Sequence, residues 1–205
     1  MLTKTRLEAF SDGVFAIVIT LLVIEIRPPE LGRGESLAHG LWNQWPSYLG
    51  YVLSFVVIGV MWLNHHRIFQ PVERIDGLLL VLNLNLLLWT AVIPFPTAVV
   101  ADFLRDGGDD ARTAVAFYTA VILVTAVSFT ALFAALTRPS IVGPDIDRRA
   151  VRRARLRFGL GVAVYGAALG VALVSPIAAL AAHAAMATYY LSEQASAPPV
   201  DVHGR

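Results

Sequence analysis

Long continuous stretches of apolar residues, separated by short polar segments, run along most of the chain. A helix that spans a bilayer needs about 20 mostly apolar residues, and six segments approach that length. We expect transmembrane helices at residues 7–26, 48–68, 78–100, 112–136, 157–174 and 176–191. The apolar runs do not alternate with polar residues, and they are too long for the strands of a membrane barrel. The pattern predicts an all-α integral membrane protein with one six-helix domain over residues 1–191.

The last apolar block, residues 158–191, contains Ser175-Pro176 near its middle. Proline disfavours helical backbone in the residue before it, so this pair predicts a tight turn between two short helices. A single kinked helix is the alternative, but about 34 residues of helix would overshoot the bilayer. Residues 192–205, which include Pro198-Pro199, are expected to form a disordered tail.

The composition favours the bilayer as the solvent for this chain. Of the 205 residues, 57% are hydrophobic and 15% are charged, and the mean hydropathy is +0.65. The net charge of +1 gives no basic field that would attract nucleic acid, and without cysteine there are no disulfides or thiolate sites. No small-x-small cleavage site follows the first apolar run, so we expect that run to remain in the mature protein.

The distribution of basic residues predicts the orientation. With six spans, only four of the 16 Lys and Arg residues lie on one side, namely Arg27, Arg33, Arg105 and Arg112. The others lie near the termini and in the second and fourth loops. Because basic loops are retained in the cytoplasm, we expect a multi-pass protein of the cell membrane with both termini cytoplasmic. The densest basic run, 148–157, is expected to contact anionic membrane lipids as a secondary role.

One face of the first predicted helix carries a continuous stripe of residues. At about 100° per residue, the stripe spans about 100° of the helix and leaves Asp12 on nearly the opposite side. Its members are Gly13, Ile17, Thr20, Leu21 and Ile24. If Asp12 packs inside the protomer, the stripe faces another helix, a symmetry mate or a central axis. On periodicity alone, packing against another helix is the simpler interpretation.

Polar residues gather at the cytoplasmic ends of the first three segments. They are Arg6, Ser11 and Asp12, then Asn64, His65 and His66, then Asn83 and Asn85. Polar groups at this depth must be paired. We therefore expect Asp12 to bond with a histidine, His65 or His66, and with an asparagine. Trp62 or Trp89 is a possible further donor.

Such a network would anchor the first helix to its own protomer. Proton sensing by a histidine near a carboxylate is the alternative. Adjacent histidines point about 100° apart on a helix and do not easily chelate one ion. We therefore expect no metal site and no cofactor.

The run Arg6-x-x-x-Phe10-Ser11-Asp12, followed by Gly13-Val14-Phe15-Ala16-Ile17, resembles the signature of the TMEM175 family of potassium-permeable channels. Residues 62–69, and residues 83–89 together with Pro94-Phe95, are also similar to that family. The resemblance implies a homotetramer whose first helices line a central pore. It also implies a constriction of bulky aliphatic side chains in place of a Thr-Val-Gly-Tyr-Gly filter, which this chain lacks. The matching positions are Ile17, Leu21 and Ile24, with Thr20 and Gly13 on the same stripe.

The expected function is a potassium-permeable cation channel, weakly to moderately selective for K⁺ over Na⁺ and also permeable to Cs⁺ or Rb⁺. A hydrocarbon ring gates by dewetting, and it favours the ion that is cheaper to dehydrate. We expect Ile17 to form the tightest ring and Thr20 to tune selectivity.

Two other function classes compete with a channel. A secondary transporter or proton-coupled carrier is the alternative, although such proteins usually show internal repeats and broken helices. An enzyme is not expected, since the sequence offers no nucleophile, phosphate loop or metal-spaced ligand set.

Overall fold

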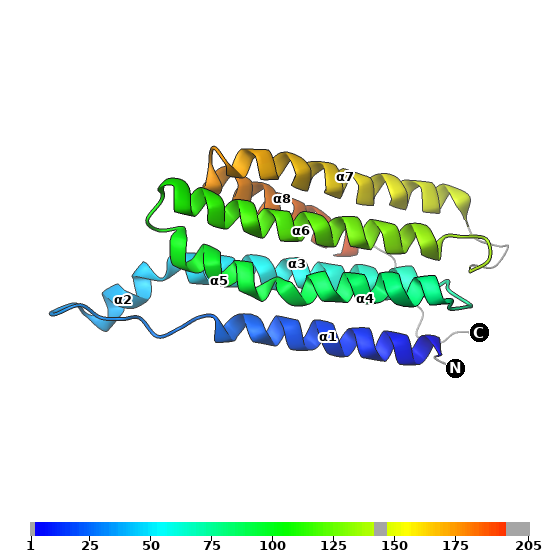
Figure 1. Cartoon of the computed structure of the whole chain (residues 1–205), viewed down its shortest axis with the longest axis horizontal. Helices are drawn as coiled ribbons and strands as arrows, with labels where there is room; N and C mark the ends of the chain where they lie inside the picture. Colours follow the sequence, from blue (N-terminus) through cyan, green and yellow to red (C-terminus); the bar gives the residue numbers. More distant parts are fainter. Residues whose placement is uncertain (1–2, 142–146, 196–205) are drawn as a thin grey trace.

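The computed structural model of this chain describes residues 3–141 and 147–195, and the regular elements of that part are all helices. The long helices lie side by side along one direction (Figure 1). In chain order they are α1 (Lys4–Ile24), α2 (Leu37–Asn43), α3 (Trp45–Phe69), α4 (Gly77–Val92), α5 (Pro94–Phe103), α6 (Gly108–Leu136), α7 (Arg148–Ala172) and α8 (Pro176–Ala195). The short α2 was not anticipated from the sequence.

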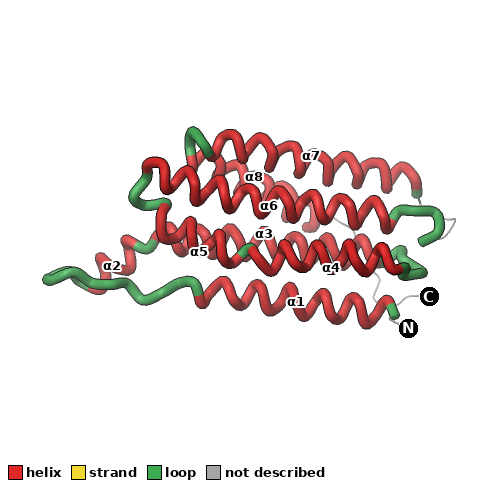
Figure 2. The backbone as a smooth tube through the Cα atoms, viewed as in Figure 1, coloured by secondary structure: helices red, strands yellow, loops and turns green. Residues whose placement is uncertain are grey.

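Five segments are long and apolar enough to cross a membrane. They are α1, α3, the combined stretch Gly77–Phe103, α6 and α7. The shorter α8, which contains His183 and Glu193, is not among them in the part of the chain that the structure describes. The regular structure of the described residues is thus entirely helical (Figure 2), and the protein is a multi-pass membrane protein.

The third predicted span, 78–100, is divided into two helices in the structure. Proline lacks a backbone N–H, and its ring clashes with the carbonyl four residues earlier. Accordingly α4 ends at Val92 and α5 begins at Pro94. The two pieces still run end to end in the same direction (Figure 1).

The last apolar block forms two helices rather than one kinked helix, since α7 ends at Ala172 and α8 begins at Pro176. Helix α7 begins at Arg148, earlier than the predicted 157, because Asp147 caps it by accepting from the Arg149 backbone N–H at 2.8 Å. Residues 192–195 belong to α8, so the expected tail is wrong there. Its remainder, 196–205, lies outside the described residues.

Asp76 fixes the start of α4 and joins it to the end of α6. Its Oδ1 accepts from the Leu79 backbone N–H at 2.9 Å, and its Oδ2 accepts from Arg138 Nη2 at 2.7 Å. The Leu79 bond is the main reason that the pKa of this carboxyl lies below its ordinary value of 3.8, and Arg138 lowers it further.

Acid should therefore remove the stabilisation that the charged Asp76 provides. A carboxyl whose pKa is lowered by folding stabilises the protein above its unfolded pKa, and this contribution is lost as the pH falls through the folded pKa. We expect Asp76→Asn to melt below the wild type at neutral pH. The gap should narrow as the pH falls below 3.8 and should close only below the lower folded pKa, where the carboxyl of the folded wild type is protonated too. A melting gap that stays constant from about pH 6 to about pH 2 would contradict this role.

Candidate functional site

Helix α1 packs into the protomer through one face only. Its buried residues recur every three or four positions and share one side of the helix: Leu7, Ser11, Phe15, Val18 and Leu22. This side packs against α3, α4 and α5. Figure 1 shows α1 at one edge of the bundle, with α7 at the opposite edge.

The opposite face of α1 is the stripe predicted from the sequence, and it lies exposed along the protomer. Ile17 is 60% exposed and Ile24 68%, although both are large hydrocarbon side chains. Gly13, Thr20 and Leu21 are exposed with them. A contiguous apolar strip of this kind indicates a surface that another element covers or that lines a passage. Within the protomer, nothing in the described residues covers it.

Thr20 has its hydroxyl turned toward its own helix. The Thr20 Oγ1 donates to the Ile17 carbonyl at 2.8 Å. Its proton is therefore engaged, and the lone pairs of the oxygen are left on the exposed face of the helix. Because the hydroxyl proton points to the carbonyl, the oxygen can present its lone pairs to a cation on the exposed face.

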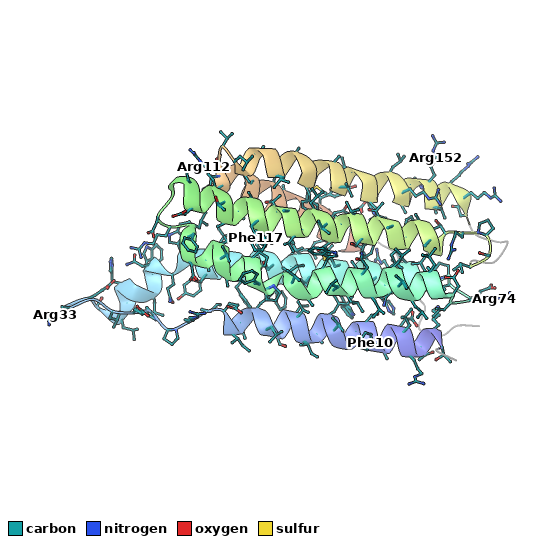
Figure 3. All side chains as sticks on the ribbon, in the orientation of Figure 1. Phe10, Arg33, Arg74, Arg112, Phe117 and Arg152 are labelled. Carbon is teal, nitrogen blue, oxygen red and sulfur yellow. The ribbon has the colours of Figure 1, made fainter. Side chains whose placement is uncertain are left out.

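Two residues of the Arg-x-x-x-Phe-Ser-Asp run, Arg6 and Phe10, lie on the exposed side of α1 with the stripe, so the expected place of Arg6 in the polar network is corrected. Phe10 is 55% exposed and precedes Ile17 by seven residues, which places both on the same side of the helix. Figure 3 labels Phe10 on α1. Arg6 is also exposed, and its side chain has no hydrogen bond or ion pair among the described residues. Neither side chain faces α3 or α4.

A chain of hydrogen bonds joins α1, α3 and α4 inside the protomer. The Asn83 Nδ2 donates to Ser11 Oγ at 3.0 Å, and the His65 Nε2 donates to Asn83 Oδ1 at 2.8 Å. Ser11 in turn donates to the Leu7 carbonyl at 2.9 Å. Ser11, His65 and Asn83 are all buried, so each bond satisfies a group that water does not reach.

His65 also packs between two aromatic rings. Its ring centroid lies 5.5 Å from that of Phe15 and 4.6 Å from that of Phe69. The imidazole is therefore held by packing as well as by its hydrogen bond. This environment agrees with an anchoring role for the residue.

Asp12 bonds to Trp62 and not to a histidine, so the predicted histidine partner is wrong. The Trp62 Nε1 donates to Asp12 Oδ1 at 2.9 Å. Asp12 is exposed, because one residue of helix turns it about 100° away from the buried Ser11. His66 is exposed on α3 and does not join the Ser11–Asn83–His65 chain. Asp12 therefore lies at the flank of α1, between the buried face and the stripe.

The other two asparagines face away from α1. The Asn85 Nδ2 donates to Ser128 Oγ at 2.8 Å and so joins α4 to α6. Asn64 is buried and lines a cavity with Tyr165 and Tyr190, among α3, α6, α7 and α8. In the ranges that the structure describes, no three His, Cys, Asp or Glu residues are grouped to hold a metal ion.

Sequence reasoning missed the polar partners on α5 and α6. Ser54 and Thr97 share a hydrogen bond of 2.8 Å, and Ser54 also donates to the Tyr118 hydroxyl at 3.2 Å. The Nε2 of His183 lies 3.0 Å from Thr119 Oγ1, and the His183 ring stacks on Tyr165. The available signal was the occurrence of single hydroxyl residues inside otherwise apolar spans, which are usually paired across helices.

Known proteins resemble this chain along nearly its whole length. The family model described as the endosomal/lysosomal potassium channel TMEM175 matches residues 6–94. A potassium channel of Streptomyces collinus is 45% identical over 194 residues, which are 94% of this chain and 94% of that protein. A potassium channel of Chamaesiphon minutus is 40% identical over 173 residues, covering 83% of this chain and 84% of that protein.

A solved structure also has the same arrangement of helices. The crystal structure of a lysosomal potassium-selective channel TMEM175 homolog from Chamaesiphon minutus superposes with a TM-score of 0.83 at 36% identity. The superposition covers 95% of this chain and 98% of that one.

Proposed function

We infer the function from one premise, which is that this chain belongs to the TMEM175 family. The chain is a potassium channel of the membrane. The observation that carries this conclusion is the exposed apolar stripe of α1, in a chain whose relatives over nearly the full length are potassium channels. Such a stripe has no role inside the protomer, but it suits the wall of an ion pathway.

The pathway we propose lies on the axis of a homotetramer in which each protomer contributes α1. One α1 cannot enclose an axis, and its stripe is exposed in the protomer. In this arrangement α8 forms a sixth span beside the five helices that are long and apolar enough to cross a membrane. Helix α8 is less apolar than the other spans because it contains His183 and ends in polar residues, while the rest of the helix is mostly apolar.

The constriction in this proposal consists of rings of Ile17, Leu21 and Ile24. Closely spaced aliphatic rings exclude water, and slight separation admits a partly hydrated ion. Hydrocarbon supplies no ligands to replace lost water, so K⁺ passes more easily than Na⁺. The Thr20 oxygen, whose proton is held by the Ile17 carbonyl, offers a contact that sharpens this preference. Gly13 leaves the cytoplasmic entrance wide.

The orientation we propose places both termini in the cytoplasm. Figure 3 shows Arg74 and Arg152 at one end of the bundle and Arg33 and Arg112 at the other. Helix α1 begins at the first of these ends (Figure 1). This end carries most of the basic residues, and basic loops are retained on the cytoplasmic side.

Currents across a planar bilayer test the function. With K⁺ on one side and Na⁺ on the other, the purified protein should give unitary currents whose reversal potential indicates a preference for K⁺. Cs⁺ or Rb⁺ should also carry current. Flux that saturates at the rate of a conformational cycle, without unitary currents, would favour the secondary transporter or proton-coupled carrier instead.

A further inference from the structure

A groove of about 590 Å³ runs between α7 and the last two turns of α8. It opens at the end of the bundle where α7 begins, near Arg152 in Figure 3. The lining residues that matter to its chemistry are Arg153, Leu156, Arg157, Leu160, Tyr189 and Glu193. None of them takes part in the α1 stripe or in the Ser11–Asn83–His65 chain.

The side chains along this face of α7 change from basic to apolar. Arg149, Arg153 and Arg157 are four residues apart and so form one ridge, with about 6 Å of helix between each pair. Leu156 and Leu160 adjoin this ridge and lie 68% and 49% exposed. Charge is thus concentrated at the helix end, and exposed hydrocarbon continues from it toward the middle of the bundle.

The base of the groove is held by an ion pair. The Arg157 Nη1 donates to Glu193 Oε2 at 2.8 Å, and the Tyr189 hydroxyl donates to Glu193 Oε1 at 3.2 Å. These bonds neutralise Glu193 and fix α8 against α7. The Arg157 Nε–H is buried and finds no acceptor among the described residues.

Two guanidinium groups begin the basic ridge, that of Arg153, which lines the groove, and that of Arg149, one turn before it, and they have one distant carboxylate between them. Arg153 is 79% exposed, and its carboxylate neighbour, Asp147, lies 3.9 Å away. Arg149 is exposed one turn earlier and has no side-chain partner in the part of the chain that the structure describes. Two open guanidinium groups one turn apart present several N–H donors in the geometry that phosphate oxygens accept.

We propose that this groove binds one anionic phospholipid. The phosphate and anionic headgroup lie against Arg149 and Arg153, and an acyl chain follows Leu156 and Leu160 past Tyr189. The two arginines stand at the beginning of a helix that is long and apolar enough to cross a membrane, and basic residues at such a helix end attract anionic lipid headgroups. A phosphatidylcholine headgroup fits less well, since its quaternary ammonium faces the same two arginines.

The test compares two variants that remove equal charge from the same end of α7. Arg149→Gln with Arg153→Gln alters the groove. Arg148→Gln with Arg152→Gln alters the face about 100° round the helix from the groove, at nearly the same depth. Native mass spectrometry of the purified assembly counts bound phosphatidylglycerol, and thermal unfolding measures its stabilisation. We expect the groove variant to lose at least roughly tenfold in phosphatidylglycerol affinity, while the control variant stays close to wild type.

Four results would overturn the proposal. The first is an equal loss of phosphatidylglycerol affinity in both variants, which would indicate adsorption by net charge, and the second is no loss in either variant. The third is equal binding of phosphatidylcholine and phosphatidylglycerol by the wild type. The fourth is a changed oligomeric mass of the groove variant, which would make the groove a contact between copies of the chain. The measurement needs no current, so its failure leaves the channel function untouched.

Discussion

Replacing Ile17 by asparagine is expected to raise the K⁺ conductance roughly tenfold, because a barrier lower by about 1.4 kcal/mol raises a rate by that factor. An amide in place of hydrocarbon lets water remain in the ring, so the ion sheds less of its hydration shell. The same change reduces the preference for K⁺ over Na⁺, because that preference comes from the lower cost of dehydrating K⁺. The permeability of K⁺ relative to Na⁺ should therefore fall. Unitary conductance and reversal potential in planar bilayers measure both effects.

Val23→Asn is the matched control for this variant. Val23 is also exposed on α1, at 51%, but it points about 120° away from Ile17. The control should leave conductance and selectivity close to those of the wild type. If both variants behaved alike, or if Ile17→Asn left the current unchanged, the ring would lie elsewhere. Thr20→Ala should lower the preference for K⁺ with a smaller effect on conductance, since the constriction keeps its width.

Replacing Asn83 by leucine is expected to destabilise the protomer by about 2–3 kcal/mol, because a buried donor left without its acceptor costs about 1–3 kcal/mol. The change removes the acceptor of the His65 Nε2–H and the donor to Ser11 Oγ. Leucine has the same branched shape and the same number of heavy side-chain atoms as asparagine, so the cost comes chiefly from the lost hydrogen bonds. Thermal unfolding of the purified protein measures the cost, and the yield of the assembled oligomer reports whether α1 remains in place.

Asn85→Leu makes the same substitution two positions along α4 and serves as its control. Asn85 is half-buried, and its partner Ser128 keeps a second bond of 2.8 Å to the Val124 carbonyl. Nothing buried is therefore left unpaired, and we expect a change within about 0.5 kcal/mol. Equal destabilisation by the two variants would show that the Ser11–Asn83–His65 chain has no special role in anchoring α1.

Periodicity along α1 was sufficient to identify its two faces. A helix fixes the angular position of every side chain, so spacing alone placed Ile17 and Ile24 on one face. Spacing favoured packing of that face against another helix, and its exposure in the protomer is seen only in the structure. The break before Pro94 was visible as a proline in the sequence, but the apolar run on both sides hid its effect on the helix. Residue spacing thus predicts which side chains share a face of a helix, because helix geometry alone determines this.

The partners of the polar residues could not be predicted in the same way. Ser11 and Asp12 are neighbours in the sequence, yet one is buried against Asn83 and the other bonds Trp62 at the flank. Which of several donors at one depth reaches an acceptor depends on the rotation and lateral position of three helices. Hydropathy sets depth only, and so it could not distinguish His65 from Trp62 as the partner of Asp12.

The single buried face of α1 has a consequence for how such a protein diverges. Substitutions on the exposed stripe cost the isolated protomer little, because no protomer core is built on Gly13, Ile17, Leu21 or Ile24. Substitutions at Ser11 or Phe15 disturb the bundle directly. Mutations on one side of α1 can therefore change conductance and ion selectivity, while the residues on its other side keep the protomer folded. Descendants of one ancestor can acquire different ion preferences without first acquiring a different fold.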